Sequence, residues 1–515
     1  MRKYIWLSVI LVQFSSNVSA QKTDTAILSK IRNEALHNSQ VMQFAEEITE
    51  TSGSRLTNSP GFFRAAKQAV TRLQSIGLQN VHLEPWGNFG RSWSMENCVV
   101  SMQLPYYLPV IAYPLAWTAS TNGTIDANVF LLSSLEADSI KKYADDIRGK
   151  IVLTAQAGAV LRSPFSSAAV RYTDSDLLHM PDKDMLTKEQ LDGMMQLING
   201  WKSGIALLQK LGCVAVLNMS GDDRDGTVSA SAWFSGKKGL WPNLPVFNMA
   251  PEHYLLIQRL LQRKERVSMR INSQTKFYDQ DTTGYNVIGE IPGSDPVLKN
   301  EVVIIGAHLD SWYSGTGATD NAAGSAVMME TMRVIKSLHL RPARTIRIAL
   351  WGGEEQGLLG SYGYVRKHFG NPETMQLLPE QENISAYYNY DNGTGKIRGI
   401  FLQNNTAAAP VFENWFSYFS DLDAKTVSLS NTGSTDHLSF DAVGIPAFQF
   451  IQDPMEYETR THHTNMDTFD HLFPEDLKQS VAVITSLVYE TAMRKHKIPR
   501  KPLPKASHWL FNLFQ

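Results

Sequence analysis

The sequence predicts an α/β fold in which a mixed, mostly parallel central sheet is flanked by helices and interrupted by an inserted β-rich segment. Two observations lead to this prediction. From residue 285 onward, short apolar runs alternate with helix-like stretches, which is typical of a largely parallel sheet covered on both faces. Residues 104 to 275 instead begin rich in proline and then contain several short strand-like runs.

Length and composition narrow the classes of protein. The chain has 515 residues, of which 43% are hydrophobic and 19% are charged. This length suggests about three domains of about 150 residues, or one large α/β domain with an insert, and the apolar content argues against disorder. Lys and Arg total 48 and Asp and Glu total 50, so the net charge is -2 and no nucleic-acid partner is expected.

The N-terminus has the pattern of a secretory signal. Arg2 and Lys3 precede a short apolar run over residues 4–14, and small residues follow at Val18, Ser19 and Ala20. The run is about half as long as the ~20 residues that a spanning helix needs. We therefore expect cleavage after Ala20, a secreted or periplasmic protein, and no stable membrane anchor.

Export would permit disulfides, but the chain contains only two cysteines, Cys98 and Cys213. They could form one bridge or remain two separate thiols. The sequence does not decide between these alternatives.

The predicted elements follow one another with recognisable boundaries. A helix is expected over residues 62–76, before Gly77, and a strand over 81–84. Further strands are expected over 127–132, 150–154, 214–218, 302–306, 345–351 and 386–390, and further helices over 205–211, 322–338 and 358–368. We divide the chain into a signal peptide (1–20), a discontinuous α/β domain (21–104 and 276–495), a β-rich insert (105–275) and a C-terminal tail (496–515).

Polar side chains that can bind metal or move protons fall directly after the predicted strands. Because the active sites of such sheets lie beyond the carboxyl ends of the strands, these residues should converge on one crevice. They are His308 and Asp310 after 302–306, Asp320 at the start of the next helix, Glu354 and Glu355 after 345–351, Asp391 after 386–390, and His462 and His463 late in the chain.

Each residue alone has an ordinary structural explanation; Asp320, for example, could simply cap a helix. Together, imidazoles and several carboxylates form a ligand set suited to zinc or a similar divalent ion. Two ions about 3.5–4 Å apart need one bridging carboxylate, and each needs two terminal ligands of its own. One further carboxylate must stay unbound to accept a proton from water, and the adjacent Glu354 and Glu355 can divide these two tasks.

Several motifs follow one another along the chain. They are GAHLDS at 306–311, GATDNAAG at 317–324, WGGEEQGLLGS at 351–361, TDH at 435–437 with GIP at 444–446, and HT at 463–464 with DT at 467–468. In order and spacing they resemble the M28 family of zinc metallopeptidases, most closely its carboxypeptidase Q (plasma glutamate carboxypeptidase) branch. The insert is similar to a protease-associated domain.

The resemblance implies a zinc exopeptidase fold, two Zn2+ ions per chain, no organic cofactor, and a role for each residue. Asp320 would bridge the ions, Glu355 and His463 would hold one, His308 and Asp391 would hold the other, Glu354 would be the general base, and Asp310 would orient His308. His462 is an alternative to His463 as ligand. Members of the family often have a cis peptide after the bridging aspartate, here Asp320-Asn321.

The implied function is a secreted co-catalytic exopeptidase of the aminopeptidase or dipeptidase type, acting on short peptides through a metal-bridging water that Glu354 activates. The insert would cap the crevice and limit substrate length. Arg460 is a candidate for binding a free carboxylate, and a homodimer is left open. Two alternatives remain: a single-zinc enzyme similar to glutaminyl cyclase, and a non-catalytic binding protein on a peptidase fold.

Overall fold

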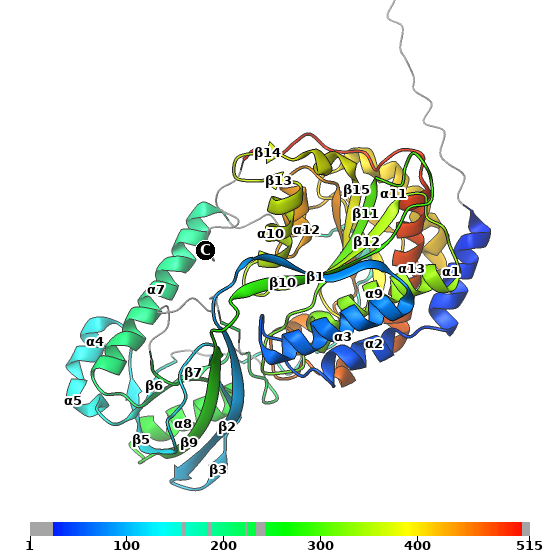
Figure 1. The fold of residues 1–515 in the computed structure, drawn as a ribbon. Coiled ribbons are helices and arrows are strands. Elements are labelled where there is room, and N and C mark those ends of the chain that lie inside the picture. The colour runs from blue at the N-terminus through cyan, green and yellow to red at the C-terminus, as the bar shows by residue number, and fades with distance from the viewer. Residues whose placement is uncertain are drawn as a thin grey trace, which may run out of the picture.

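The computed structural model describes residues 24–156, 161–182, 187–221, 224–229, 231–232 and 243–506. Within these residues, two eight-stranded sheets organise two units that lie next to each other, a larger one and a smaller one (Figure 1). The predicted signal peptide lies outside the described residues.

The sheet of the larger unit is mixed, with parallel strands in its centre. The central strands β12, β11, β15 and β18 pair in parallel, and β1 and β10 on one side pair antiparallel to their neighbours. Near the other edge, β16 pairs antiparallel to β18 and parallel to β17. In sheet order the strands are β1 (Gln79–Asn88), β10 (Thr283–Ile291), β12 (Thr345–Trp351), β11 (Val302–His308), β15 (Ile384–Asn389), β18 (Ala447–Gln452), β16 (Ile397–Phe401) and β17 (Thr426–Ser428).

Helices cover both faces of this sheet. Strand β11 shows why: Val303 and Ile305 lie in one hydrophobic core, whereas Val302 and Ile304 lie in another, since successive side chains point to opposite faces. One face packs on α1 (Thr25–His37), α2 (Val41–Thr49), α3 (Pro60–Ile76), α9 (Ala323–Ser337), α11 (Ala409–Phe416) and α13 (Pro474–Met493). The opposite face packs on α10 (Leu359–His368) and α12 (His437–Asp441), near the short pair β13 (Gly370–Asn371) and β14 (Gln376–Leu377).

Most predicted elements of this unit are present at nearly the expected residues. Helix α3 shows the local reasons. The Ser59 side chain accepts a hydrogen bond from the amide of Phe62, Pro60 occupies the first turn, and Gly77 ends the helix in a left-handed conformation.

The smaller unit is built on the second sheet. One face packs on α8 (Pro251–Gln262), and the other on α4 (Ala137–Lys142), α5 (Ala144–Ile147) and α7 (Lys188–Lys210). In sheet order the strands are β3 (Leu108–Pro109), β2 (Ser92–Leu104), β9 (Ser268–Tyr278), β5 (Ile125–Leu132), β6 (Ile151–Thr154), β7 (Ala215–Met219), β8 (Val246–Met249) and β4 (Ala112–Pro114).

The two units are joined by two neighbouring strand connections. Strand β1 pairs with β10 in the first sheet, and β2, which follows β1, pairs with β9, which precedes β10, in the second. The second sheet therefore includes the strand Ser92–Leu104, which the sequence had placed in the α/β domain. The apolar alternation of that strand does not reveal which sheet it joins.

One helix is longer than the sequence predicted. We expected a helix only over residues 205–211 after a polar excursion, whereas α7 begins at Lys188. Thr187 and Gln190 form a reciprocal capping box at its start. The prediction missed this part because its apolar side chains are not confined to one face: Leu191 is buried, whereas Leu197 is exposed.

A buried carboxylate ties residues 161–182 of the smaller unit to the larger one. Asp453 is fully buried, and its oxygens accept hydrogen bonds from Arg171 (2.8 Å), Arg398 (2.8 Å) and the amide of Tyr172 (3.0 Å). Val170 also pairs with Met455. This segment, which contains the short helix α6 (Asp174–Leu178), therefore lies against the loop that follows β18.

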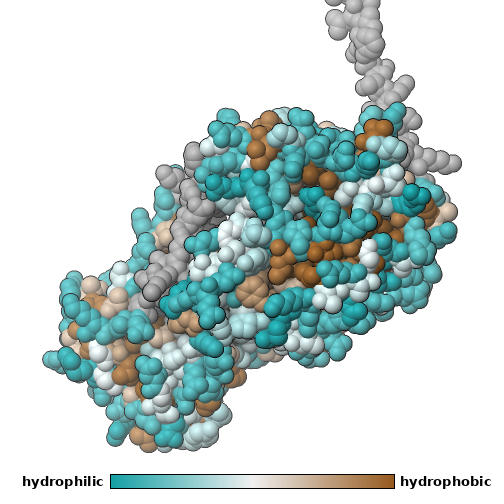
Figure 2. Space-filling view, in the orientation of Figure 1, coloured by the Kyte–Doolittle hydropathy of each residue, from teal (hydrophilic) through white to brown (hydrophobic). Residues whose placement is uncertain are grey.

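The remaining surface is mainly hydrophilic, with apolar patches over both units in the view of Figure 2. Among the described residues, we find no helix with the length and apolar character needed to cross a membrane. Cys98 and Cys213 are both free thiols, so they do not pair. The described part of the C-terminal tail packs on the body, where Lys501 forms an ion pair with Asp441 at 2.7 Å.

Asp453→Ala tests this tie between the units. The substitution leaves Arg398, which is 7% exposed, without its carboxylate partner, and we expect unfolding free energy to fall by about 3–5 kcal/mol. Arg270→Ala is the control, because both side chains of its ion pair with Asp126 are exposed and its loss should change stability little. Urea unfolding measures both, and equal losses would contradict the assigned importance of the buried carboxylate.

Candidate metal centre

The predicted site residues meet beyond the carboxyl ends of three neighbouring strands, β11, β12 and β15. The register explains the convergence, because His308 on β11 lies opposite Trp351 on β12, and Gly306 lies opposite Asn389 on β15. His308 ends β11, Glu354 and Glu355 follow β12, Asp391 follows β15, Asp320 lies in the turn Ala318–Ala322 before α9, and His463 lies in the loop before α13.

Asp320 is the centre of this group. Its Oδ1 lies 3.1 Å from Nε2 of His308, and its Oδ2 lies 3.2 Å from Nε2 of His463. The carboxylate is almost completely buried, at 3% exposure. A single carboxylate thus faces two imidazoles with its two oxygens.

Each of the two histidines also has a second carboxylate. Nε2 of His308 lies 3.5 Å from Oδ1 of Asp391, and Nε2 of His463 lies 2.9 Å from Oε2 of Glu355. The structure therefore brings together the same two pairs that the M28 resemblance implied, with Asp320 between them.

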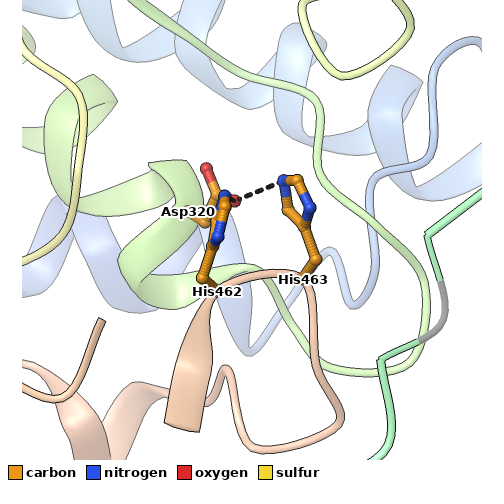
Figure 3. A group of neighbouring side chains, drawn as sticks. All are labelled: Asp320, His462 and His463. Carbon is orange, nitrogen blue, oxygen red and sulfur yellow. Dashed lines mark ion pairs between the residues drawn. The ribbon is translucent and has the colours of Figure 1, made fainter. Parts of the chain in front are cut away.

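His462 and His463 are distinguished by their distances. Both project from one loop toward Asp320, and the ion pair with His463 is the one drawn in Figure 3. His462 Nε2 is 3.9 Å from Asp320, and its other nitrogen faces Glu458 at 3.8 Å. His463 is therefore closer to Asp320 and, unlike His462, contacts Glu355.

Asp310 supports the site differently from what the sequence suggested. Nδ1 of His308 lies 3.0 Å from the main-chain oxygen of Asp310, but 3.8 Å from its carboxylate. The carboxylate instead accepts hydrogen bonds from the amides of Glu354 (3.2 Å) and Glu355 (3.3 Å). The backbone carbonyl orients the imidazole and leaves Nε2 for a ligand, while the side chain fixes both glutamates.

A threonine from the N-terminal part of the chain completes this support. The Thr57 hydroxyl lies 2.9 Å from Oδ2 of Asp310 and 2.5 Å from Oε1 of Gln356, whereas Nε2 of Gln356 has no partner. One hydroxyl proton cannot serve two acceptors, so the Gln356 amide is better assigned in the opposite orientation. Gln356 then donates to Thr57, and Thr57 donates to Asp310.

Two further supporting residues were not predicted as site residues. Asp467 accepts hydrogen bonds from the amides of Thr319 (2.6 Å) and Asp320 (3.1 Å). The fully buried Arg55 donates to the carbonyl oxygens of Leu309 (2.7 Å), Thr316 and Gly317 (2.8 Å). Asp467 belongs to the quoted DT motif, but no sequence motif marks Arg55.

The peptide bond between Asp320 and Asn321 is cis, as the resemblance predicted. The Asn321 side chain donates to the carbonyl oxygen of Tyr390 at 2.9 Å and accepts from the amide of Gly324 at 2.9 Å. This connects the turn that carries Asp320 to the end of β15.

The electrostatics of the site are those of crowded, buried carboxylates. Burial and the charge of Asp320 raise the pKa of Glu355 to about 7. Burial also raises the pKa of Glu354 well above its ordinary value, with contributions from Asp391 and Asp436. Burial works against a charged His463, but Glu355 and Asp320 outweigh it and raise the pKa of the imidazole. The site therefore favours positive charge beside its carboxylates.

A bound cation fits these donors. Oδ2 of Asp320 and Oε1 of Glu355 are buried and have no hydrogen-bond partner, although buried carboxylate oxygens are normally satisfied. Ligand atoms of His308, Asp320 and Glu355 lie within 4.8 Å of one another, as do those of Asp320, His462 and His463. Imidazole nitrogens with carboxylate oxygens form a donor set that zinc accepts.

Known proteins and solved structures are similar to this chain. Residues 286–488 match the model of peptidase family M28. The chain carries a peptidase family M28 domain. Beyond the M28 domain, the similarity extends along most of the chain, because carboxypeptidase Q from Bos taurus is 26% identical over 461 residues, covering 88% of this chain and 85% of that protein.

Solved structures share the fold of the M28 domain and its neighbouring unit. A peptidase M28 precursor from Shewanella amazonensis SB2B has a TM-score of 0.68 at 26% identity, over 93% of this chain and 98% of that one. The zinc aminopeptidase BSAP from Bacillus subtilis has a TM-score of 0.56 at 21% identity, over 89% and 96%. The predicted family, the α/β fold class and the class of metallo-exopeptidase are confirmed.

The candidate for binding a substrate carboxylate, Arg460, already has acidic partners. Its guanidinium lies 3.1 Å from Glu456 and 3.8 Å from Asp225. Its positive charge is therefore largely compensated within the protein.

Thr57→Val tests the support beneath the two glutamates. The change keeps the shape of the side chain but removes the hydroxyl, so buried groups on Asp310 and Gln356 lose a partner. We expect the free energy of unfolding in urea to fall by about 1–3 kcal/mol. Thr49→Val is the matched control, because the buried Thr49 hydroxyl bonds only to the helix carbonyl of Ala45. A loss no larger than that of the control would contradict the role of Thr57.

Proposed function

We propose that this protein is an exported di-zinc exopeptidase that hydrolyses short peptides. The observation that carries the proposal is the placement of Asp320, whose two oxygens face His308 and His463, each beside a carboxylate of its own. Two sets of ligands joined by one carboxylate are what a co-catalytic pair of metal ions requires.

We assign His308 and Asp391 to one zinc ion, His463 and Glu355 to the other, and Asp320 to both. The zinc aminopeptidase with the same fold supports the choice of metal. When bound, zinc supplies Lewis-acid polarisation of the scissile carbonyl and a lowered pKa for water.

Glu354 is the residue that moves the proton. It is 9% exposed at the site, and its backbone is fixed by the hydrogen bond from its amide to Asp310. Its carboxylate accepts a proton from the attacking water and returns it to the nitrogen of the leaving amine, so one group serves as base and then as acid. Glu355 is the next residue and faces His463, so the two adjacent glutamates divide ligation and proton transfer.

The charge around the site favours the amino end of a peptide. Two bound zinc ions would offset the charge of the carboxylates at the centre, so Arg460 decides which end of a peptide is favoured. Because Glu456 and Asp225 already compensate Arg460, its charge is not available to a substrate carboxylate. We therefore favour aminopeptidase or dipeptidase action, although a relative is named carboxypeptidase Q.

The neighbouring unit supports a preference for short peptides. Trp312 and His463 line a pocket at the centre, and the Trp312 ring packs edge-on, 6.4 Å between centroids, against Trp117, which belongs to the core of the smaller unit. We propose that this unit is a protease-associated-like insert that covers one side of the crevice. Export is proposed from the basic and apolar pattern of residues 1–20.

Glu354→Gln separates catalysis from metal binding. We expect the variant to keep the zinc content of the wild type, while kcat/KM for dipeptides falls by about 10²–10⁴-fold, because only the proton acceptor is removed. Zinc analysis and dipeptide hydrolysis on the same samples measure this. Glu46→Gln, at an exposed position of α2, is the matched control and should retain activity.

The same assay can contradict the proposal in two ways. Unchanged hydrolysis by Glu354→Gln would show that another group accepts the proton. A single zinc ion, with cyclisation of N-terminal Gln instead of hydrolysis, would favour a function similar to that of glutaminyl cyclase.

The adjacent histidines provide a second test. His463→Ala should lose one of two zinc ions, since His463 lies within 3.2 Å of Asp320 and 2.9 Å of Glu355. His462→Ala should retain both, because its nitrogen is 3.9 Å from Asp320. Metal analysis after dialysis distinguishes them, and the reverse result would move the ligand assignment to His462.

A further inference from the structure

His463 is held in an unusual backbone conformation. Its φ is +60°, in the left-handed region that residues other than glycine rarely occupy. Such a conformation persists only when the surrounding structure maintains it. The contacts of the loop that follows His463 are therefore important for where its imidazole points.

Some of these contacts are local. The amide of Thr464 donates to the carbonyl oxygen of Thr461 at 3.1 Å, and the amide of Asp467 donates to that of Thr464 at 3.3 Å. These hydrogen bonds close a short turn. They do not tie the turn to the second sheet.

Contacts from the smaller unit provide that connection. The amide of Val228 donates to Oδ1 of Asn465 at 2.6 Å, and the amide of Asn465 donates to the carbonyl oxygen of Val228 at 3.1 Å. Nδ2 of Asn465 donates to the carbonyl oxygen of Gly226 at 3.3 Å, and Ser229 pairs with Thr464 in an antiparallel bridge. Asn465 thus uses both its main chain and its side chain.

The segment Gly226–Ser229 is itself anchored in the second sheet. The amide of Ser229 donates to Oγ of Ser220, which follows β7, and its carbonyl oxygen accepts from Nδ2 of Asn248 on β8 at 2.9 Å. Val228 is completely buried. A continuous chain of hydrogen bonds therefore runs from β7 and β8 to the residue two positions after His463.

We propose that Asn465 is a positioning residue that fixes the His463 imidazole for zinc, so that the second sheet is part of the metal centre. The inference rests on the proposed function. Without the Asn465 side chain, the loop samples other conformations and must be ordered each time zinc binds. This lowers the affinity for the ion held by His463. Binding of the ion held by His308 and Asp391 changes less, because neither residue lies in this loop and the loop reaches that ion only through Asp467, which holds the backbone of the shared Asp320.

Zinc occupancy at buffered concentrations of free zinc tests the proposal. We expect Asn465→Ala to weaken the binding of one zinc ion by about 10–100-fold and that of the other by clearly less. Asn465→Asp retains an acceptor for the Val228 amide but loses the donor to Gly226, so its shift should be smaller. Asn405→Ala is the matched control, since this 3% exposed asparagine donates to Pro499 in a different region and should not change the zinc curve.

The melting temperature of the zinc-free proteins separates positioning from general destabilisation. A zinc-occupancy curve of Asn465→Ala that overlays that of the wild type would overturn the inference. Equal loss of affinity for both zinc ions, in proportion to a lower melting temperature, would also overturn it. If Asn465→Ala does not fold, Asn465→Asp carries the same test. A wild-type protein that never binds a second zinc ion would overturn the proposed function itself and, with it, this inference.

Discussion

The structure depends on holding several carboxylates together in a buried space. Asp320, Glu354, Glu355 and Asp391 meet at one end of the parallel strands, where water is largely excluded. Unpaired, such groups would repel one another and take up protons, as the raised pKa of Glu355 indicates. Compensating positive charge would therefore stabilise the group, and we propose that the two imidazoles on either side of Asp320 mark where zinc binds.

The surrounding residues hold the backbone at the site and so determine where its carboxylates point. Asp310 accepts hydrogen bonds from the amides of both glutamates, and Asp467 accepts one from the amide of Asp320. Another acidic side chain thus fixes the backbone of each of these three residues. Arg55 is fully buried and donates hydrogen bonds to the carbonyl oxygens of Leu309 and Gly317, in the loop that leads to Asp320. Since these contacts join segments far apart in the chain, the centre forms only when the whole domain has folded.

The sequence predicted the residues at the strand ends because a strand fixes where its last side chain points. His308, after a run of apolar residues, is an example. Supporting contacts were harder to predict. Arg55 and Thr57 act on loops about 250 residues later in the chain through side-chain hydrogen bonds, and no local pattern marks them. Residues 92–104 were assigned to the α/β domain, but strand Ser92–Leu104 pairs in the second sheet, which its own sequence does not indicate.

The central claim is that Asp320 lies between two metal ions. Anomalous diffraction at the zinc absorption edge, on crystals grown with zinc, tests it most directly. We predict two peaks beside Asp320, one between His308 and Asp391 and one between His463 and Glu355. A single peak, or peaks that do not contact Asp320, would contradict the account.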